Sequence, residues 1–261
     1  MRDQQGLEWT FDTVAGGYEK MRPGYSQELY RKLFDYIPLG RESNVLEIGI
    51  GAGQATGPIL RTGCRLTAVE YGENFSRLCR EKFREFPNFT VVTGRFEEAD
   101  LPPESFDFIF SASAFHWIPE KTGYPKVYSL LKSGGAFARF ANHPFEDKGR
   151  KDLADEIQEL YALYYTGPAG RPAEYSWEMA QKRADIAAAY GFKDIQCALF
   201  HRTRTFSSRE YTALLGTYSD HIAMEETRRG EFFSRIEQAI DAHGGRITLY
   251  DTMDLQLARK P

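Results

Sequence analysis

Ten residues near the start of the chain, 45–54 (VLEIGIGAGQ), constrain its fold more than any other stretch. They open with an apolar run typical of a buried strand in a parallel sheet. Gly49, Gly51 and Gly53 then follow at alternate positions. Because glycine has no Cβ, the backbone can turn sharply there and a ligand can approach it closely. The stretch therefore predicts a strand, a glycine turn and a helix, with a ligand-binding site at the turn.

The spacing of the glycines separates two kinds of ligand. A dinucleotide-binding fingerprint is GxGxxG, in which the third glycine packs the helix on the strand. Here Gln54 occupies that third position, and Glu47 stands two residues before a GxGxG run. Residues 66–70 (LTAVE) are typical of a second strand that ends in Glu70, whose carboxylate can accept both hydroxyls of a ribose. The pattern disfavours a nicotinamide dinucleotide, and the alternative is a glycine turn in another α/β protein with a chance acid.

Several ordered motifs carry a family resemblance. The GxGxG run after Glu47 resembles motif I of the class I S-adenosylmethionine-dependent methyltransferases. Residues 18–25 (YEKMRPGY) resemble the Y…RPxY leader of the branch similar to trans-aconitate methyltransferase, within the methyltransferase type 11 group. Residues 111–117 (SASAFHW) resemble its motif IV, and residues 130–135 (LLKSGG) resemble its LLKPGG element. The resemblance implies methyl transfer from S-adenosyl-L-methionine to a small-molecule acceptor, with S-adenosyl-L-homocysteine as product.

The implied fold is α/β: a Rossmann-like seven-stranded sheet with helices on both faces and an inserted helical cap. We expect a single methyltransferase domain over 1–261. Its parts are an N-terminal arm over the cofactor (1–43), a cofactor-binding half (44–141), the cap (142–193) and C-terminal strands and helices that complete the sheet (194–261).

Local patterns predict the boundaries of individual elements. We expect a helix over 75–86 with Asn74 or Ser76 as its N-cap. Residues 207–210 (SSRE) are typical of a capping box, and we expect the helix that follows to continue as far as residue 221. The last strand, 246–259, is expected to run antiparallel to its neighbours.

For the cofactor, the resemblance implies a set of binding residues spread over the leader and the strand ends: Tyr18, Arg22, Glu47, Gly49, Gly51, Gly53, Glu70, Tyr71, Arg95, Phe96, Ser111 and Phe115. Arg95 stands where the family often places an acid that binds the adenine amine. We therefore expect the backbone of Arg95 and Phe96 to take over that contact.

The acceptor is expected beside the end of the fourth strand. His116 follows that strand and is the candidate catalytic base for a hydroxyl acceptor. A carboxylate acceptor is already ionised at neutral pH and needs no base. Trp117 supplies an apolar wall, and Tyr218 and His221 are three residues apart, which predicts one shared helix face. We expect the acceptor between the His116–Trp117 turn and that face.

A carboxylate acceptor also requires a cation. The candidates are Arg22, Arg171 and Arg204, and the sequence does not choose among them.

Composition excludes several classes of function. The net charge of -4 and the pI near 5.8 give no positive field to attract nucleic acid. The three cysteines are far apart, and the five histidines lack ligand spacing, so no metal is implied. The start of the chain lacks the apolar core of a secretory signal, and no run is long enough to span a membrane. We expect a cytoplasmic protein with neither membrane nor nucleic acid as partner.

Two other functions remain open at this point. One is a noncatalytic module that binds S-adenosylmethionine without turnover, which needs the same loop. The other is a nicotinamide-dependent oxidoreductase, which Gln54 and Glu47 disfavour.

Overall fold

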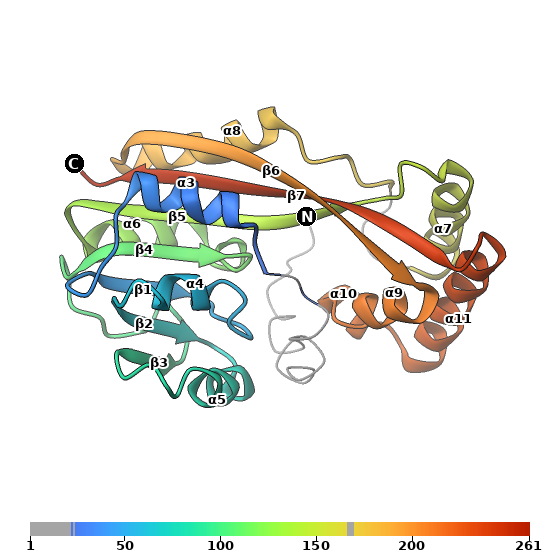
Figure 1. The fold of residues 1–261 in the computed structure, drawn as a ribbon, viewed down its shortest axis with the longest axis horizontal. Coiled ribbons are helices and arrows are strands. Elements are labelled where there is room, and N and C mark those ends of the chain that lie inside the picture. The colour runs from blue at the N-terminus through green and yellow to red at the C-terminus, as the bar shows by residue number, and fades with distance from the viewer. Residues whose placement is uncertain (1–21, 23, 166–169) are drawn as a thin grey trace. The chain divides into compact units, whose positions relative to one another are not determined.

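The computed structural model describes residue 22, residues 24–165 and residues 170–261 of the 261-residue chain. In these ranges seven strands form one sheet in the order β3-β2-β1-β4-β5-β7-β6 (Figure 1). The strands are β1 (Asn44–Ile48), β2 (Arg65–Glu70), β3 (Phe89–Thr93), β4 (Phe106–Ala112), β5 (Leu131–Phe145), β6 (Lys193–Ser207) and β7 (Arg246–Arg259). The predicted seven-stranded α/β fold is confirmed.

The helices alternate with the strands in the first half and cluster in the second. They are α3 (Gln27–Tyr36), α4 (Thr56–Leu60), α5 (Glu73–Lys82), α6 (Glu120–Leu130), α7 (Lys151–Tyr164), α8 (Trp177–Asp185), α9 (Ser208–Leu215), α10 (Ser219–Ile222) and α11 (Glu226–Ala242), with 3-10 turns η1 (Phe115–Trp117) and η2 (Ile186–Tyr190).

The first five strands are parallel. Parallel strands need crossover connections, and helices α4, α5 and α6 lie in the connections from β1 to β2, from β2 to β3 and from β4 to β5. Strand β1 pairs in parallel with β2 on one side and β4 on the other, so that Val45 lies between Leu66 and Phe108. Strands β2 and β3, and β4 and β5, are also parallel pairs. The carboxyl ends of β1, β2 and β4 therefore meet at one edge of the sheet, which is where ligands bind in open α/β sheets.

The last strand is antiparallel, as predicted. Lys260, just past the end of β7, exchanges backbone hydrogen bonds of 2.8 and 2.9 Å with Gly134 and Gly135 near the start of β5. The Thr205 hydroxyl, late in β6, bonds the Thr248 hydroxyl, early in β7, at 3.0 Å. In both pairs a late residue of one strand meets an early residue of the other, which is antiparallel pairing.

The described chain forms two compact units. The sheet unit comprises residues 24–142, Ser176–Phe200 and Met253–Pro261. The helical unit comprises Arg22, residues 143–165 and 170–175, and His201–Thr252. The division falls inside the predicted cap of residues 142–193, because α7 belongs to the helical unit whereas α8 and η2 belong to the sheet unit.

Each unit has its own core. Successive side chains of β1 point to opposite faces of the sheet and enter two different clusters. Val45 lies in a cluster with Leu29 of α3 and Ile59 of α4. Leu46 lies in a cluster with Val127 of α6. Helices therefore cover both faces of this sheet. The helical unit is built around a third cluster of buried residues from α7, α9, α11 and β7: Leu153, Ile157, Tyr211, Leu214, Leu215, Phe232, Ile236, Ala239, Ile240, Ile247 and Leu249.

Two local predictions were wrong. Helix α5 begins at Glu73 after Gly72, without a side-chain cap, so neither Asn74 nor Ser76 is the N-cap. The predicted capping box at Ser207 and Glu210 is present, but α9 ends at Leu215. Tyr218 has extended dihedral angles (φ -87°, ψ 133°) and is the N-cap of the separate helix α10. Tyr218 and His221 are therefore not on the face of one continuous helix.

Candidate active site at the carboxyl edge of the sheet

The glycine loop after β1 has a left-handed backbone conformation at each of its three glycines. Gly49, Gly51 and Gly53 have φ angles of 71°, 54° and 75°, in the left-handed region that side chains disfavour. A Cβ on Gly49 would lie 2.4 Å from the Ala114 Cβ, and one on Gly53 would lie 2.5 Å from the Phe83 ring. A Cβ on Gly51 would meet no atom closer than 3.9 Å. Close packing thus explains why glycine stands at positions 49 and 53. At Gly51, in contrast, the backbone faces open space.

Glu70 ties the loops after β1 and β2 together. Its Oε2 accepts a hydrogen bond from the Gly51 N–H, and its Oε1 accepts one from the Gly72 N–H, each at 2.8 Å. The side chain is buried, with the residue 8% exposed. A carboxylate can accept about four hydrogen bonds. Glu70 can therefore accept hydrogen bonds from these two amides and from the two hydroxyls of a ribose.

Glu47 lies underneath the loop rather than at its surface. It is 0% exposed, and its Oε2 accepts a hydrogen bond of 2.8 Å from the Thr56 hydroxyl. Its Oε1 has no hydrogen-bond partner among the described residues. Burial raises the pKa of Glu47 to about 8, which the Thr56 hydrogen bond only partly opposes. Thr56 was not predicted as a site residue, although the sequence shows this hydroxyl residue shortly after the glycines, where α4 begins.

The segment after β4 forms a second side of this edge. Ser111 is buried, and its hydroxyl donates to the Ile48 carbonyl at 2.8 Å. Phe115 is also buried, with its ring 5.0 Å from that of Phe137. Both predicted cofactor residues thus use their side chains inside the protein, which favours a role in shaping the strand end over direct contact with a ligand.

Tyr25 and Ser113 form a polar pair at this edge that the sequence did not reveal. Ser113 has φ of 54°, an unfavourable angle for serine, and its N–H donates to the Phe140 carbonyl at 2.8 Å. Its hydroxyl lies 2.8 Å from the Tyr25 hydroxyl. The Tyr25 ring packs edge-on against Phe140 at 4.7 Å. The leader tyrosine is therefore held at the end of β4 by a contact that is remote in sequence.

His116 and Trp117 follow in η1. His116 is exposed and Trp117 is half-buried, and their ring centroids are 4.9 Å apart. The His116 imidazole is thus exposed at this edge, and its role as a base stays a prediction.

At the end of β2 and β3, Tyr71 and Arg95 are associated. The Arg95 guanidinium lies 4.5 Å from the centroid of the Tyr71 ring, which is 44% exposed as a residue. The Arg95 carbonyl accepts hydrogen bonds from the Glu98 and Ala99 amides at 3.1 and 3.0 Å. Phe96 is buried. Arg95 and Tyr71 thus present a cation and an aromatic ring at the adenine end predicted for the site.

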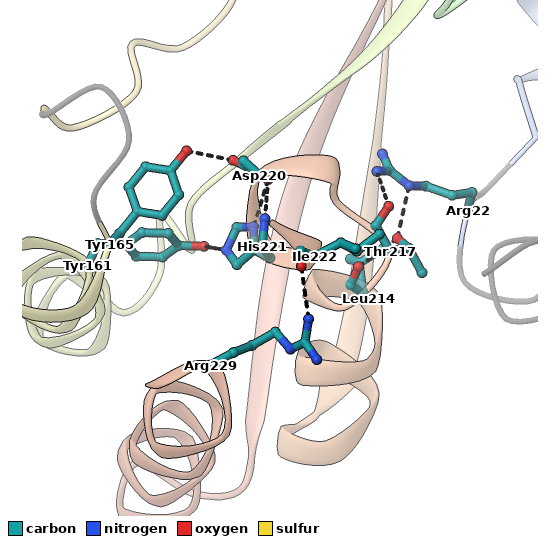
Figure 2. Close-up of polar contacts among 9 residues, drawn as sticks. All are labelled: Arg22, Tyr161, Tyr165, Leu214, Thr217, Asp220, His221, Ile222 and Arg229. Carbon is teal, nitrogen blue, oxygen red and sulfur yellow. Dashed lines mark hydrogen bonds and ion pairs between the residues drawn. The ribbon is translucent and has the colours of Figure 1, made fainter. Parts of the chain in front are cut away.

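Arg22, Tyr218 and His221 belong to the helical unit. Figure 2 shows the contacts of Arg22 and His221. The Arg22 Nε donates to the Thr217 hydroxyl at 3.1 Å, and its Nη2 donates to the Thr217 carbonyl at 3.2 Å. The same guanidinium lies 4.1 Å from the centroid of the Tyr218 ring. Tyr18 is outside the described residues.

His221 is part of a buried hydrogen-bond network. It is 3% exposed, its Nδ1 lies 2.8 Å from Asp220 Oδ1, and its Nε2 lies 2.9 Å from the Tyr161 hydroxyl (Figure 2). Because a carboxylate only accepts, Nδ1 donates to Asp220, and Nε2 is paired with the Tyr161 hydroxyl. The Tyr165 hydroxyl donates to the other oxygen of Asp220 at 2.8 Å. Both ring nitrogens of His221 are thus engaged within the helical unit.

Arg171, one of the three candidate cations, is committed to acidic partners. It contacts Glu146 at 2.7 Å and Asp155 at 2.6 Å. In the described ranges, no group of three or more histidine, cysteine or acidic side chains could hold a metal ion. In the same ranges, no helix has the length and apolar character needed to cross a membrane.

A mainly parallel sheet with a glycine loop after β1 and a carboxylate at the end of β2 is typical of Rossmann-like proteins that bind a ribose-containing cofactor. A family model described as a methyltransferase domain matches residues 46–138. An uncharacterized methyltransferase of Schizosaccharomyces pombe is 25% identical over 223 residues, which are 84% of this chain and 83% of the relative. One of Geobacillus sp. (strain WCH70) is 30% identical over 148 residues, which are 53% of this chain and 68% of the relative.

The solved structures agree on the fold. A putative type II methyltransferase from Anaeromyxobacter dehalogenans has a TM-score of 0.63 at 20% identity, covering 91% of this chain and 97% of the other. The chain belongs to the class I S-adenosylmethionine-dependent methyltransferases.

Proposed function

We propose that this chain binds S-adenosyl-L-methionine at the glycine loop and transfers its methyl group to an oxygen atom, carboxylate or hydroxyl, of a small molecule. The observation that carries this proposal is the Glu70 carboxylate, held by the amides of Gly51 and Gly72 at 2.8 Å each. It stands at the carboxyl end of β2, where a ribose diol is bound in this class of fold.

The chain supplies binding and positioning to the reaction. Bare backbone at Gly51 admits the cofactor, Glu70 binds its ribose, and Tyr71 and Arg95 flank its adenine. When bound, S-adenosylmethionine supplies an electrophilic methyl group on a sulfonium centre. Holding the acceptor oxygen in line with that methyl group and excluding water are the main contributions expected of the protein.

The requirement for a base depends on the acceptor. For a hydroxyl acceptor, His116 accepts the proton, because it is an exposed imidazole at the carboxyl edge of the sheet. For a carboxylate acceptor, His116 orients the substrate without accepting a proton, because the carboxylate is already ionised.

The test is the release of S-adenosyl-L-homocysteine from the full chain across a panel of small carboxylic acids and phenols. Release with at least one acceptor supports the proposal, and the His116→Gln variant should lose turnover of a phenol while its affinity for S-adenosylhomocysteine is unchanged. Tight cofactor binding without turnover on any acceptor would favour a noncatalytic binding module. Binding of a nicotinamide dinucleotide in place of S-adenosylhomocysteine would favour an oxidoreductase.

A further inference from the structure

The turn after β3, residues 94–99, begins beside the residue proposed to bind the ribose. The Gly94 N–H donates to the backbone carbonyl of Glu70 at 2.8 Å. Within the turn, the Ala99 N–H donates to the Arg95 carbonyl at 3.0 Å. The start of the turn is therefore tied to the end of β2, where the Glu70 carboxylate stands. An adenine attached to a ribose at Glu70 is within reach of this turn.

Lys126, on α6, contacts the same turn at three points. Its Nζ donates to the Ala99 carbonyl at 2.7 Å and to the Glu97 carbonyl at 3.1 Å. The same nitrogen lies 5.2 Å from the centroid of the Phe96 ring, which is buried. Hydrogen bonds from a charged donor are stronger than those between neutral groups. A single half-buried side chain thus ties the turn to α6.

The turn also supplies the environment that keeps Lys126 in place. Burial lowers the pKa of its ammonium group, and the carboxylates of Glu97 and Asp100 oppose that change. An ammonium group has three donors and no acceptor, and two of these donors are used for the carbonyls of the turn. An apolar side chain at position 126 would leave the Glu97 and Ala99 carbonyls without this donor.

The backbone between these two anchored carbonyls and β3 is where the family resemblance places the adenine contact, at Arg95 and Phe96. The Arg95 carbonyl already accepts hydrogen bonds from two amides of the turn. The Phe96 N–H, in contrast, forms no hydrogen bond within the part of the chain that the structure describes. A backbone N–H is a donor, and N1 of adenine is an acceptor. The Phe96 N–H is therefore the group of this turn that matches N1 of adenine.

We propose that Lys126 is a positioning residue for the adenine of the cofactor: by holding the Glu97 and Ala99 carbonyls, it fixes the Phe96 N–H where it donates to N1 of the base. The inference rests on the proposed binding of S-adenosylmethionine at the glycine loop. It adds a residue of α6 that contacts the turn and not the cofactor. N1 of hypoxanthine carries a proton and cannot accept this hydrogen bond, so a fixed N–H selects adenine over hypoxanthine.

The experiment is calorimetric titration of the full chain with S-adenosylhomocysteine and, separately, with S-inosylhomocysteine, in which hypoxanthine replaces adenine. The wild-type chain should bind the adenine compound about tenfold more tightly, the effect of one matched hydrogen bond. Lys126→Met keeps an unbranched side chain but removes the donor, and it should reduce this preference to about threefold or less. Lys121→Met, at an exposed lysine of the same helix, is the matched control and should keep the wild-type preference.

Hydrogen exchange of the unliganded chain separates positioning from a merely structural role. Lys126→Met should speed exchange of the Ala99 amide, and Lys121→Met should not. Faster exchange together with an unchanged preference for adenine would overturn the inference, as would a wild-type chain that binds both compounds equally. If Lys126→Met fails to fold, Lys126→Ala also removes the donor and suits a helix, so the same comparison decides.

Failure of the proposed function has a different outcome. A chain that binds neither compound contradicts both the proposed function and this inference. A chain whose preference for adenine depends on Lys126, but which releases no S-adenosylhomocysteine with any acceptor, supports this inference and contradicts the proposed methyl transfer.

Discussion

Glu47 shows how a single buried carboxyl group is expected to affect stability. Its pKa is about 8 in the folded chain against a reference value of 4.5, with burial as the main cause. Between these pH values the folded state binds more protons than the unfolded state, so the free energy of unfolding falls as the pH rises. The slope is at most about 1.4 kcal/mol per pH unit for one group.

We predict that Glu47→Gln flattens this dependence, because an amide of the same shape does not titrate. Urea unfolding at pH 5, 6.5 and 8 measures it. Glu42→Gln, at a side chain that is 97% exposed, is the control and should keep the wild-type slope. Parallel curves for Glu47→Gln and the wild type would show that Glu47 is ionised in the folded chain throughout this range.

Gly51 allows backbone strain to be separated from obstruction of the site. Its φ of 54° is disfavoured for β-branched residues but tolerated by asparagine. We predict that Gly51→Asn stays near the wild-type melting temperature yet weakens S-adenosylhomocysteine binding more than tenfold, because its side chain fills the open space beside the loop. Gly51→Val should lose both stability and binding. Wild-type affinity in a folded Gly51→Asn variant would mean that the cofactor does not approach this residue.

At the scale of elements, the helical unit depends on the network that joins α7 to α10. Without the Tyr161 hydroxyl, the buried Nε2 of His221 loses its hydrogen-bond partner, which costs about 1–3 kcal/mol. We predict that Tyr161→Phe lowers the free energy of unfolding by this amount and speeds hydrogen exchange in α10. The control is Tyr164→Phe on the same helix, because among described residues the Tyr164 hydroxyl forms no hydrogen bond. Equal effects of the two variants would rule out the network as a support of α10.

The elements that local patterns define were predictable from the sequence. The strands 44–48 and 65–70 are short apolar runs, the glycines at 49, 51 and 53 have spacing that only a turn explains, and the capping box at Ser207 and Glu210 is a local signal. The same holds for Glu70, which ends an apolar run at the expected distance from the loop.

Features set by contacts remote in sequence were not predictable. Helix α9 ends before Gly216, but Gly216 itself has helical dihedral angles instead of the left-handed ones common after a helix. The extended conformation of Tyr218 accompanies the contact of Arg22 with Thr217. The small residues Ala180, Ala184 and Ala187 show helical periodicity, but that pattern does not say which core they enter. The pair of Tyr25 and Ser113 joins positions 88 residues apart.

In the whole molecule, the predicted cofactor residues and the residues Arg22, Arg204 and Tyr218 lie in different compact units. The sheet unit carries the glycine loop, Glu70 and His116, and the helical unit carries Arg22, Arg204 and Tyr218. Cofactor binding and the stability of the helical unit should therefore respond to different substitutions. Variants of the loop should change the affinity for S-adenosylhomocysteine, and Tyr161→Phe should leave that affinity unchanged.

Calorimetric titration of the full chain with S-adenosyl-L-homocysteine tests whether the cofactor binds at the glycine loop. The wild-type chain should bind it, and Glu70→Ala should bind about 10- to 150-fold more weakly, which is 1.5–3 kcal/mol for hydrogen bonds to a charged group. Glu73→Ala, which removes a neighbouring exposed carboxylate, should bind as the wild type does. No binding by the wild-type chain, or equal affinity of Glu70→Ala and the wild type, would contradict the placement of the cofactor at this loop.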